Sequence, residues 1–219
     1  MAQPAFAEKG VTPLFEALRN SGQLTRHVHS WYLSANPDEQ SEILMGDWDT
    51  TKFKESELHW HALVKDTFWA VKLDDILVDG VSTGFCTRPG ANCTVCPDSG
   101  TSQLTFPQKH YSEWSEKYGD KVDCDESDLM AFPDLTFVID GVHYNMPTNH
   151  WIKRKVNDTN PKGGFCESTI EPLDVGQVGL EEMHILGDAF MQLFYTIHDA
   201  EKNRVGFAPA IHNLPEVVV

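Results

Sequence analysis

Residues 95–102 read Val95-Cys96-Pro97-Asp98-Ser99-Gly100-Thr101-Ser102, an apolar run that leads into an aspartate, a glycine and hydroxyl side chains. The aspartate therefore leaves a strand at a tight turn, where the hydroxyls can donate hydrogen bonds to its carboxylate and hold it in place. Gly100 has no Cβ, so another backbone can approach this turn closely. The same residues also suit an Asx-turn or a helix cap, in which Asp98 only accepts hydrogen bonds from nearby amides. The segment alone leaves both interpretations open.

Short strand-like segments surround this motif and are separated by turn residues. They are rich in β-branched and aromatic side chains, which favour extended structure. Asp79-Gly80 and Asp140-Gly141 lie between apolar runs, as the central residues of hairpin turns do. Turns are also expected at Asn36-Pro37-Asp38 and at Pro161-Lys162-Gly163-Gly164. Strands are predicted over residues 30–34, 41–45, 59–64, 68–73, 75–78 and 135–139.

Three segments carry helix signals. The first has Pro13 in its first turn, an apolar face and a stop at Gly22, and the second is amphipathic and stops at Gly119. The predicted helices cover residues 12–22, 107–118 and 188–193. Many short strands, few helices and no repeat or linker predict an all-β fold with a few short helices, organised as one domain over residues 1–219.

Composition places the chain among ordinary globular proteins and argues against two classes of partner. Hydrophobic residues make up 41% of it and charged residues 23%, the balance of a folded domain. The 33 acidic side chains outnumber the 17 Lys and Arg, which gives a formal net charge of −16 at pH 7. Such a surface repels phosphate backbones and anionic lipids, so neither nucleic acid nor a membrane surface is an expected partner. No run of about 18 apolar residues occurs that would predict a transmembrane helix.

The cysteines and histidines give no spacing that is typical of a metal site. A zinc site at Cys93-x-x-Cys96 would need a second such pair or a matched histidine pair, and the sequence offers neither at ligand spacing. The pairs His27-Val28-His29 and His59-Trp60-His61 are interpreted as surface or packed histidines. We therefore predict no metal and no cofactor. Glycosylation sequons begin at Asn92 and Asn157. The cysteines are odd in number, so at least one lies outside any disulfide within the chain: Cys86, Cys93, Cys96, Cys124 and Cys166.

Together with its surroundings, the motif resembles the pepsin family of aspartic proteases over nearly the whole chain. That family carries a D-[ST]-G-[ST] motif in each of two lobes, and Asp98-Ser99-Gly100-Thr101 matches the second one. Each further piece is short, but the order and spacing of the pieces follow the family pattern. The matching pieces are residues 4–6, 10–15, 34, 43–46, 58–60, 68–69, 73–80, 132–141, 185–188, 195–199 and 203–209.

The resemblance implies a fold, a cysteine pairing and a compartment. The fold is one lobe, the C-terminal one, of the bilobal pepsin-like acid protease. The implied disulfides are Cys86–Cys93 and Cys124–Cys166, with Cys96 left over. Disulfides in turn imply an oxidising setting, in the secretory pathway, in an acidic lysosome-like or vacuole-like compartment or outside the cell.

The resemblance also implies that Asp98 is one of the two catalytic aspartates. Thr101 would hydrogen-bond its outer oxygen, and Ser99 would brace the loop against the opposite lobe. Apolar side-chain pockets would be lined by Phe68, Cys96 and Ile185. The full set of supporting and substrate-binding residues is Ser99, Gly100, Thr101, Ser102, Phe68, Cys96, Ile185 and Gly187.

The first lobe of the family, with its own D-T-G motif and flap tyrosine, has no counterpart in this sequence. Residues 1–10 also lack the features of a signal peptide, so the chain is interpreted as cytosolic or as an internal piece of a precursor. Three explanations fit the half site: a fragment, one chain of a processed two-chain enzyme, or a self-pairing lobe. The expected function is peptide-bond hydrolysis by a two-aspartate dyad on a polypeptide substrate, with the missing N-terminal lobe as partner. The alternative is a non-catalytic peptide-binding or self-pairing lobe.

Overall fold

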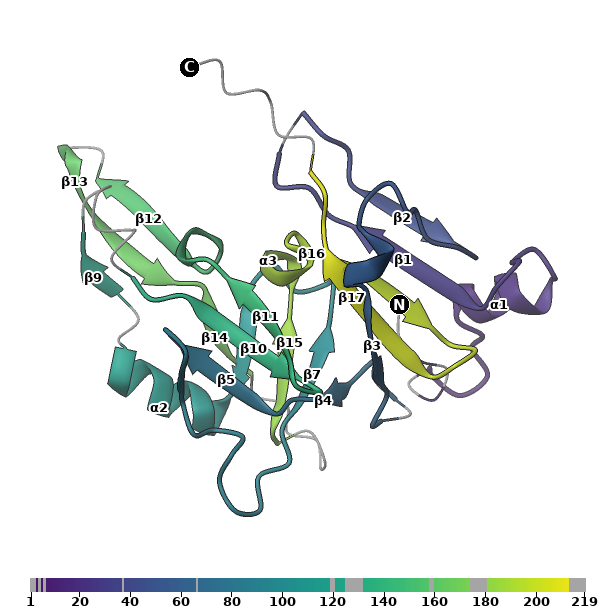
Figure 1. Cartoon of the computed structure of the whole chain (residues 1–219), viewed down its shortest axis with the longest axis horizontal. Coiled ribbons are helices and arrows are strands. Elements are labelled where there is room, and N and C mark those ends of the chain that lie inside the picture. Colours follow the sequence, from purple (N-terminus) through teal and green to yellow (C-terminus); the bar gives the residue numbers. More distant parts are fainter. Residues whose placement is uncertain are drawn as a thin grey trace. The chain divides into compact units, whose positions relative to one another are not determined.

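The structure is a computed structural model that describes residues 3, 5, 7–36, 38–65, 67–118, 121–124, 132–157, 160–173 and 181–212. Most of its regular structure is β-strand, with three short α-helices in the described part, so the predicted β-rich fold is confirmed (Figure 1). Every helix within these ranges is too short or too polar to span a membrane. Contacts divide the chain into two compact units. Unit 1 comprises residues 1–71 and 191–219, and unit 2 comprises residues 72–190.

Unit 1 is built on a five-stranded sheet in the order β2-β1-β16-β17-β3, in which every neighbouring pair is antiparallel. All six residues of the central strand β16 are buried, and they include the polar side chains of Thr196, His198 and Asp199. The elements are α1 (Leu14–Asn20), β1 (Val28–Tyr32), β2 (Glu42–Met45), the 3-10 helix η2 (Glu55–Glu57), β3 (His59–Ala62), β16 (Phe194–Asp199) and β17 (Arg204–Pro209).

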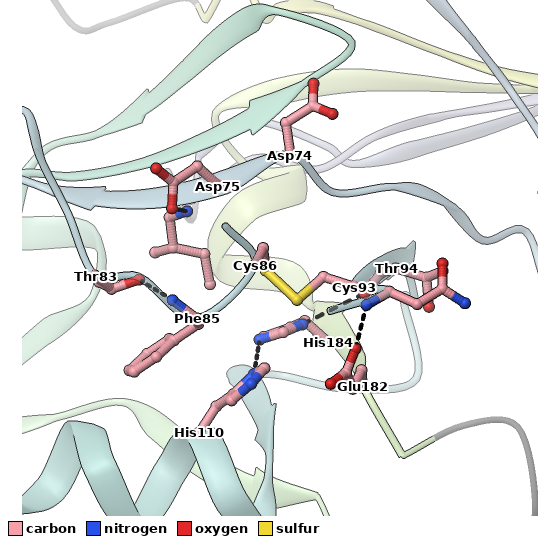
Figure 2. The surroundings of a disulfide bond; sticks show 12 residues. Asp74, Asp75, Thr83, Phe85, Cys86, Cys93, Thr94, His110, Glu182 and His184 are labelled. Carbon is pink, nitrogen blue, oxygen red and sulfur yellow. Dashed lines mark hydrogen bonds between the residues drawn. A yellow bond between two sulfur atoms is a disulfide. The ribbon is translucent and has the colours of Figure 1, made fainter. Parts of the chain in front are cut away.

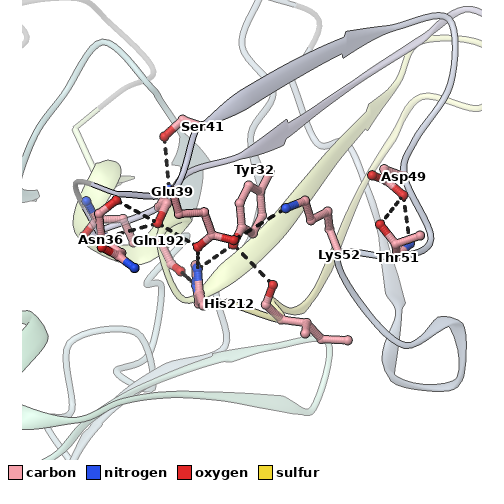
Figure 3. Close-up of polar contacts among 11 residues, drawn as sticks. Tyr32, Asn36, Glu39, Ser41, Asp49, Thr51, Lys52, Gln192 and His212 are labelled. Atoms are coloured by element: carbon pink, nitrogen blue, oxygen red, sulfur yellow. Dashed lines mark hydrogen bonds and ion pairs between the residues drawn. The ribbon is translucent and has the colours of Figure 1, made fainter. Parts of the chain in front are cut away.

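A polar cluster fixes the last described residues of unit 1 against strand β1 (Figure 3). The Tyr32 hydroxyl lies 2.8 Å from His212 Nδ1, and His212 Nε2 lies 2.6 Å from the Gln192 carbonyl oxygen. Glu39, whose side chain is 8% exposed, lies 3.5 Å from both the Lys52 ammonium and His212 Nδ1. Burial and the Glu39 carboxylate raise the pKa of Tyr32, so this hydroxyl keeps its proton and remains able to donate. The cluster therefore joins the two sequence segments that make up the unit.

Unit 2 contains three sheets, and the one that carries the 95–102 segment has the order β14-β8-β15-β7-β4. The other two have the orders β11-β10-β5-β6 and β12-β13-β9. The strands are β4 (Val71–Lys72, at the boundary between units), β5 (Asp75–Val78), β6 (Val81–Ser82), β7 (Thr94–Pro97), β8 (Leu104–Pro107), β9 (Lys121–Asp123), β10 (Leu135–Ile139), β11 (Val142–Met146), β12 (Ile152–Asn157), β13 (Asn160–Ser168), β14 (Ile170–Leu173) and β15 (Met183–Leu186). The helices are α2 (Gln108–Tyr118), α3 (Asp188–Met191) and the 3-10 helix η4 (Thr148–His150).

Local turn chemistry was a poor guide at residues 161–164 and a good one at three other places. At the predicted 36–38 turn, the Glu39 N–H donates to the Asn36 carbonyl oxygen over 3.1 Å. Asp79-Gly80 and Asp140-Gly141 all have positive φ and connect β5 to β6 and β10 to β11, as predicted. The turn predicted at 161–164 is wrong, because these residues lie within β13, which pairs with both β12 and β9. The strand predicted over 68–73 shrinks to β4, since only Val71 and Lys72 find a ladder partner. Gly119, the predicted end of α2, and residues 158–159 of the second sequon lie outside the described residues.

Two histidines contact each other in the core of unit 1. His29 on β1 and His198 on β16 are directly opposed in the ladder, and their rings stack with centroids 4.4 Å apart. Trp69 packs edge-on against both rings, at 5.5 and 4.9 Å. The Trp31 indole N–H donates to His29 Nδ1 over 3.1 Å, so that nitrogen carries no proton. Burial lowers the pKa of His29 to about 3 and the pKa of His198 well below its usual value, so both rings are neutral at pH 7.

This pair makes the stability of the chain depend on pH. Between about pH 6.5 and the lowered native pKa, the unfolded chain binds protons that the folded chain does not. The pair's contribution is complete above about pH 7 and is lost as the pH falls, by about 2 kcal/mol per histidine between pH 7 and pH 5. Urea unfolding at both pH values should show a loss of stability that is about 2 kcal/mol smaller in His198→Phe than in the wild type. The exposed His59, replaced by Gln, serves as the control, and equal losses in wild type and His198→Phe would contradict the assignment.

Candidate functional site

Asp98 lies at the end of strand β7, and its carboxylate is held by two donors from the turn that follows. The Gly100 backbone N–H donates to Oδ1 over 3.0 Å, and the Thr101 hydroxyl donates to Oδ2 over 2.8 Å. The turn closes on itself, because the Thr101 backbone N–H also donates to the Asp98 carbonyl oxygen over 3.1 Å. One oxygen thus meets a backbone donor and the other a side-chain donor, which fixes the plane of the carboxylate.

Strand β15 lies between β7 and β8 in the sheet and supports the turn that connects them. It pairs in parallel with β7, where Leu186 opposes Pro97, and antiparallel with β8. At the end of the ladder the Asp98 backbone N–H donates to the Leu186 carbonyl oxygen over 3.0 Å. The Gly187 N–H donates to the Gln103 carbonyl oxygen over 3.1 Å, and the Asp188 N–H donates to the Thr101 carbonyl oxygen over 2.8 Å. The backbone of residues 186–188 therefore carries the loop that presents Asp98.

Gly187 is required at its position by this close approach. A Cβ added there would overlap the carbonyl oxygens of both Gln103 and Thr101, which belong to the backbone and cannot rotate away. Any larger residue would push β15 away from the loop and break the hydrogen bonds on either side of it. The sequence prediction placed Gly187 in the supporting element, and the geometry supplies the physical reason for a glycine.

A second carboxylate, that of Asp188, lies close enough to Asp98 to respond to its charge. Asp188 begins helix α3 and is partly buried. Burial raises the pKa of Asp188, and the negative charge of Asp98 raises it further. Sequence reasoning included Asp188 in the matching segment without assigning it to the site. Its position directly after Ile185-Leu186-Gly187 is the signal that would have found it.

The structure brings eight of the nine predicted site residues together in unit 2. Gly100 and Ser102 are exposed, while Asp98, Ser99 and Thr101 are partly exposed, so the turn is reachable from solvent. Cys96 and Ile185 oppose each other in the β7–β15 ladder and are both buried. Phe68 belongs to unit 1 and is partly buried there. The eight residues in unit 2 are Cys96, Asp98, Ser99, Gly100, Thr101, Ser102, Ile185 and Gly187.

The cysteines of unit 2 form two disulfides, Cys86–Cys93 and Cys124–Cys166. Cys96 lies outside both and is buried within β7, with its sulfur 3.6 Å from the Pro97 carbonyl oxygen. The first disulfide closes the loop immediately before β7. It therefore anchors the start of the strand whose end carries Asp98.

The pKa of Asp188 reports whether Asp98 carries a negative charge. Asp98→Asn removes the like charge beside Asp188, so the pKa of Asp188 should fall while staying above its usual value, because burial still opposes ionisation. Carboxyl ¹³C NMR titration of Asp188 measures this shift. Asp38→Asn, which removes an exposed carboxylate in unit 1, should leave the Asp188 titration unchanged. A titration of Asp188 that is identical in Asp98→Asn and in the wild type would refute the coupling.

Comparisons with known proteins identify the family that shares this arrangement. The sequence matches the family described as eukaryotic aspartyl protease over residues 1–210. It is 33% identical over 220 residues to cathepsin E of Oryctolagus cuniculus, 31% over 215 residues to pepsin A of Sus scrofa and 29% over 219 residues to gastricsin of Callithrix jacchus. These alignments cover 95–96% of the chain but only 52–53% of each relative, so the chain spans about half the length of the curated relatives it matches.

The fold agrees with a match to about half of each relative. A mainly β chain with three short described helices suits a single lobe of the pepsin fold. The chain belongs to the eukaryotic aspartyl protease family.

Proposed function

We propose that this chain is the C-terminal lobe of an aspartic endopeptidase and that Asp98 supplies one of its two catalytic carboxylates. The observation that carries the proposal is the Asp98 carboxylate, held by the Gly100 N–H and the Thr101 hydroxyl at the end of β7. Membership of the family supports it, because the matching motif is the one in which that family keeps an aspartate. The partner is a first lobe with its own D-T-G motif, and the substrate is a polypeptide.

The chemistry follows from two carboxylates that lie close together. Both cannot easily be ionised at once, so the pair holds one proton between them and titrates as a unit. The ionised carboxylate takes a proton from a water molecule as the water oxygen attacks the peptide carbonyl carbon. The protonated carboxyl group donates a hydrogen bond to the carbonyl oxygen, and a proton then passes to the leaving amine as the C–N bond breaks.

The other site residues would bind and position the substrate. Gly100 is exposed, so a substrate backbone can run along it without meeting a side chain. Cys96 and Ile185 of unit 2 would line an apolar side-chain pocket, and Phe68 would do so within unit 1. The two disulfides suit an oxidising setting, and we place the protein in the secretory pathway, in an acidic lysosome-like or vacuole-like compartment or outside the cell.

Reconstitution with a first lobe tests the proposal. The chain is refolded together with the N-terminal lobe of a protease of the same family and assayed with a fluorescence-quenched peptide across acid and neutral pH. Cleavage should require both lobes and should be fastest at acid pH, where the dyad holds one proton. Asp98→Asn should lower kcat by about 10²–10⁴-fold, because a positioned acid–base group is lost.

Asp38→Asn is the matched control, since it makes the same chemical change at an exposed position of unit 1 and should leave kcat unchanged. If Asp98→Asn cleaves as fast as the wild type, Asp98 has no catalytic role. If the paired lobes bind a statine-type peptide but never cleave, the chain is instead a non-catalytic peptide-binding lobe. Cleavage by the chain alone, second order in its concentration, would identify a self-pairing lobe.

A further inference from the structure

Two buried histidines lie against the Cys86–Cys93 disulfide in unit 2, apart from the turn that holds Asp98. Figure 2 shows the rings of His110, from helix α2, and His184, from strand β15, meeting beside the sulfur bond. His110 Nδ1 lies 3.2 Å from His184 Nε2, and the rings stack with centroids 5.2 Å apart. One ligand atom each from Cys93, His110 and His184 lies within 4.8 Å of the other two. The disulfide bond adds the sulfur of Cys86 to this group.

The hydrogen bonds determine which ring nitrogens carry protons. His184 Nδ1 lies 3.4 Å from the Thr94 carbonyl oxygen, which can only accept, so this nitrogen is the donor. In a neutral ring the His184 Nε2 atom then holds a lone pair and accepts from the His110 Nδ1 proton. A histidine that donates one N–H to a backbone carbonyl and turns the other nitrogen toward a cluster of potential ligands has the arrangement typical of metal-binding histidines.

The surroundings keep both rings dry and uncharged. Phe85 stacks on His110 at 4.8 Å, and Phe106 meets His184 edge-on at 5.1 Å. Burial lowers the pKa of His184 to about 3 and also lowers the pKa of His110. Both imidazoles are therefore neutral at pH 7, which is the state that binds a metal ion.

We propose that the Cys86–Cys93 disulfide caps a latent zinc site, and that its reduction creates a four-ligand site formed by Cys86, Cys93, His110 and His184. Two thiolates and two imidazoles are a common ligand set of tetrahedral structural zinc. With Zn–N bonds of 2.0–2.1 Å, two nitrogens of a tetrahedral site lie about 3.3 Å apart. The two histidine nitrogens already lie 3.2 Å apart, so their separation need hardly change, although the rings must turn until both lone pairs point at the ion.

The conversion requires a reductant for the disulfide, such as a thiol, and a zinc ion. Two equivalents of a monothiol, or one of a dithiol, reduce the disulfide to two cysteine thiols and become a disulfide themselves. Zinc then replaces the thiol protons of Cys86 and Cys93, which are released to solvent. His184 Nε2 gives its lone pair to the metal, and the His110 ring moves its proton from Nδ1 to Nε2 so that Nδ1 can do the same. The ion carries two positive charges and the thiolates two negative ones, so the buried site is neutral.

The four proposed ligands lie near the start of strands β7 and β15, so replacing the disulfide by zinc would affect how these strands are anchored. Cys93 directly precedes β7, and His184 lies in β15, where Met183 pairs with Thr94 at the start of the parallel ladder. Either the disulfide or the zinc ion would therefore anchor the beginning of the two strands whose ends carry Asp98 and Gly187. In the reduced chain, zinc would take over the anchoring that the disulfide provides in the oxidised one.

Cobalt(II) is the probe for the reduced chain, because its spectrum reports both geometry and sulfur ligation. The 219-residue chain is reduced with a phosphine, freed of reductant and titrated with Co²⁺ under anaerobic conditions. One equivalent should produce the visible bands of tetrahedral Co²⁺ and a sulfur-to-cobalt charge-transfer band, both displaced by Zn²⁺, whereas the oxidised chain should produce neither. His110→Gln and His184→Gln should each weaken binding by at least about 100-fold, since even the loss of a ligand's partner costs about 10–100-fold.

The exposed His143, replaced by Gln, is the matched control and should bind Co²⁺ as the wild type does. Near-UV circular dichroism of each oxidised variant, in which the disulfide still holds the fold, shows whether the substitution itself disturbs the protein. Independently of any variant, Zn²⁺ should protect Cys86 and Cys93 of the reduced wild type from alkylation and leave Cys124 and Cys166 reactive. The proposal is overturned if the reduced chain gives no thiolate–cobalt band, if both histidine variants retain it, or if zinc fails to protect these two cysteines.

Discussion

The closest backbone approach in the candidate site, that of Gly187 to the loop after Asp98, is the constraint on which unit 2 depends. Because residue 187 has no side chain, β15 can lie between β7 and β8, and the N–H groups of Gly187 and Asp188 can donate to the carbonyl oxygens of Gln103 and Thr101. Those bonds satisfy the carbonyl oxygens of a loop that is otherwise partly exposed. The carboxylate of Asp98 is therefore placed by backbone geometry, and its own hydrogen bonds only set its orientation.

The start of the β7–β15 ladder is also held in place. At its start, Thr94 pairs with Met183, next to the Cys86–Cys93 disulfide and the His110–His184 contact. A four-residue parallel pair would be a weak support by itself, since it has few ladder bonds to hold its register. The β7–β15 pair is held at both ends, by the Cys86–Cys93 disulfide at its start and by the backbone contact of Gly187 at its end. The turn that carries Asp98 is stabilised because it follows directly from this pair of strands.

Much of this could be predicted from the sequence wherever one local signal decides the outcome. The Asp-Gly pairs at 79 and 140 adopt positive φ because of their own chemistry, and the hydroxyls after Asp98 reach its carboxylate over a few bonds. The prediction failed where distant partners decide. Residues 161–164 look like a turn but lie in β13, because the ladder with β12 continues past them to Asn160. The role of Asp188 was likewise hidden, since its pKa is raised by burial in the fold and by the charge of a residue 90 positions earlier in the chain.

The two buried histidine pairs show why burial and residue type do not by themselves assign a function. His29 and His198 stack more closely than His110 and His184 do, and the pKa values of all four are lowered mainly by burial. In the first pair the Trp31 N–H already occupies the His29 nitrogen that holds a lone pair, and Trp69 covers both rings. In the second pair the lone pair of His184 is directed at another imidazole, with sulfur beside it. The first arrangement can only resist protonation, whereas the second has the donor atoms to hold a cation, and this difference in donor atoms is invisible in the spacing of the residues along the chain.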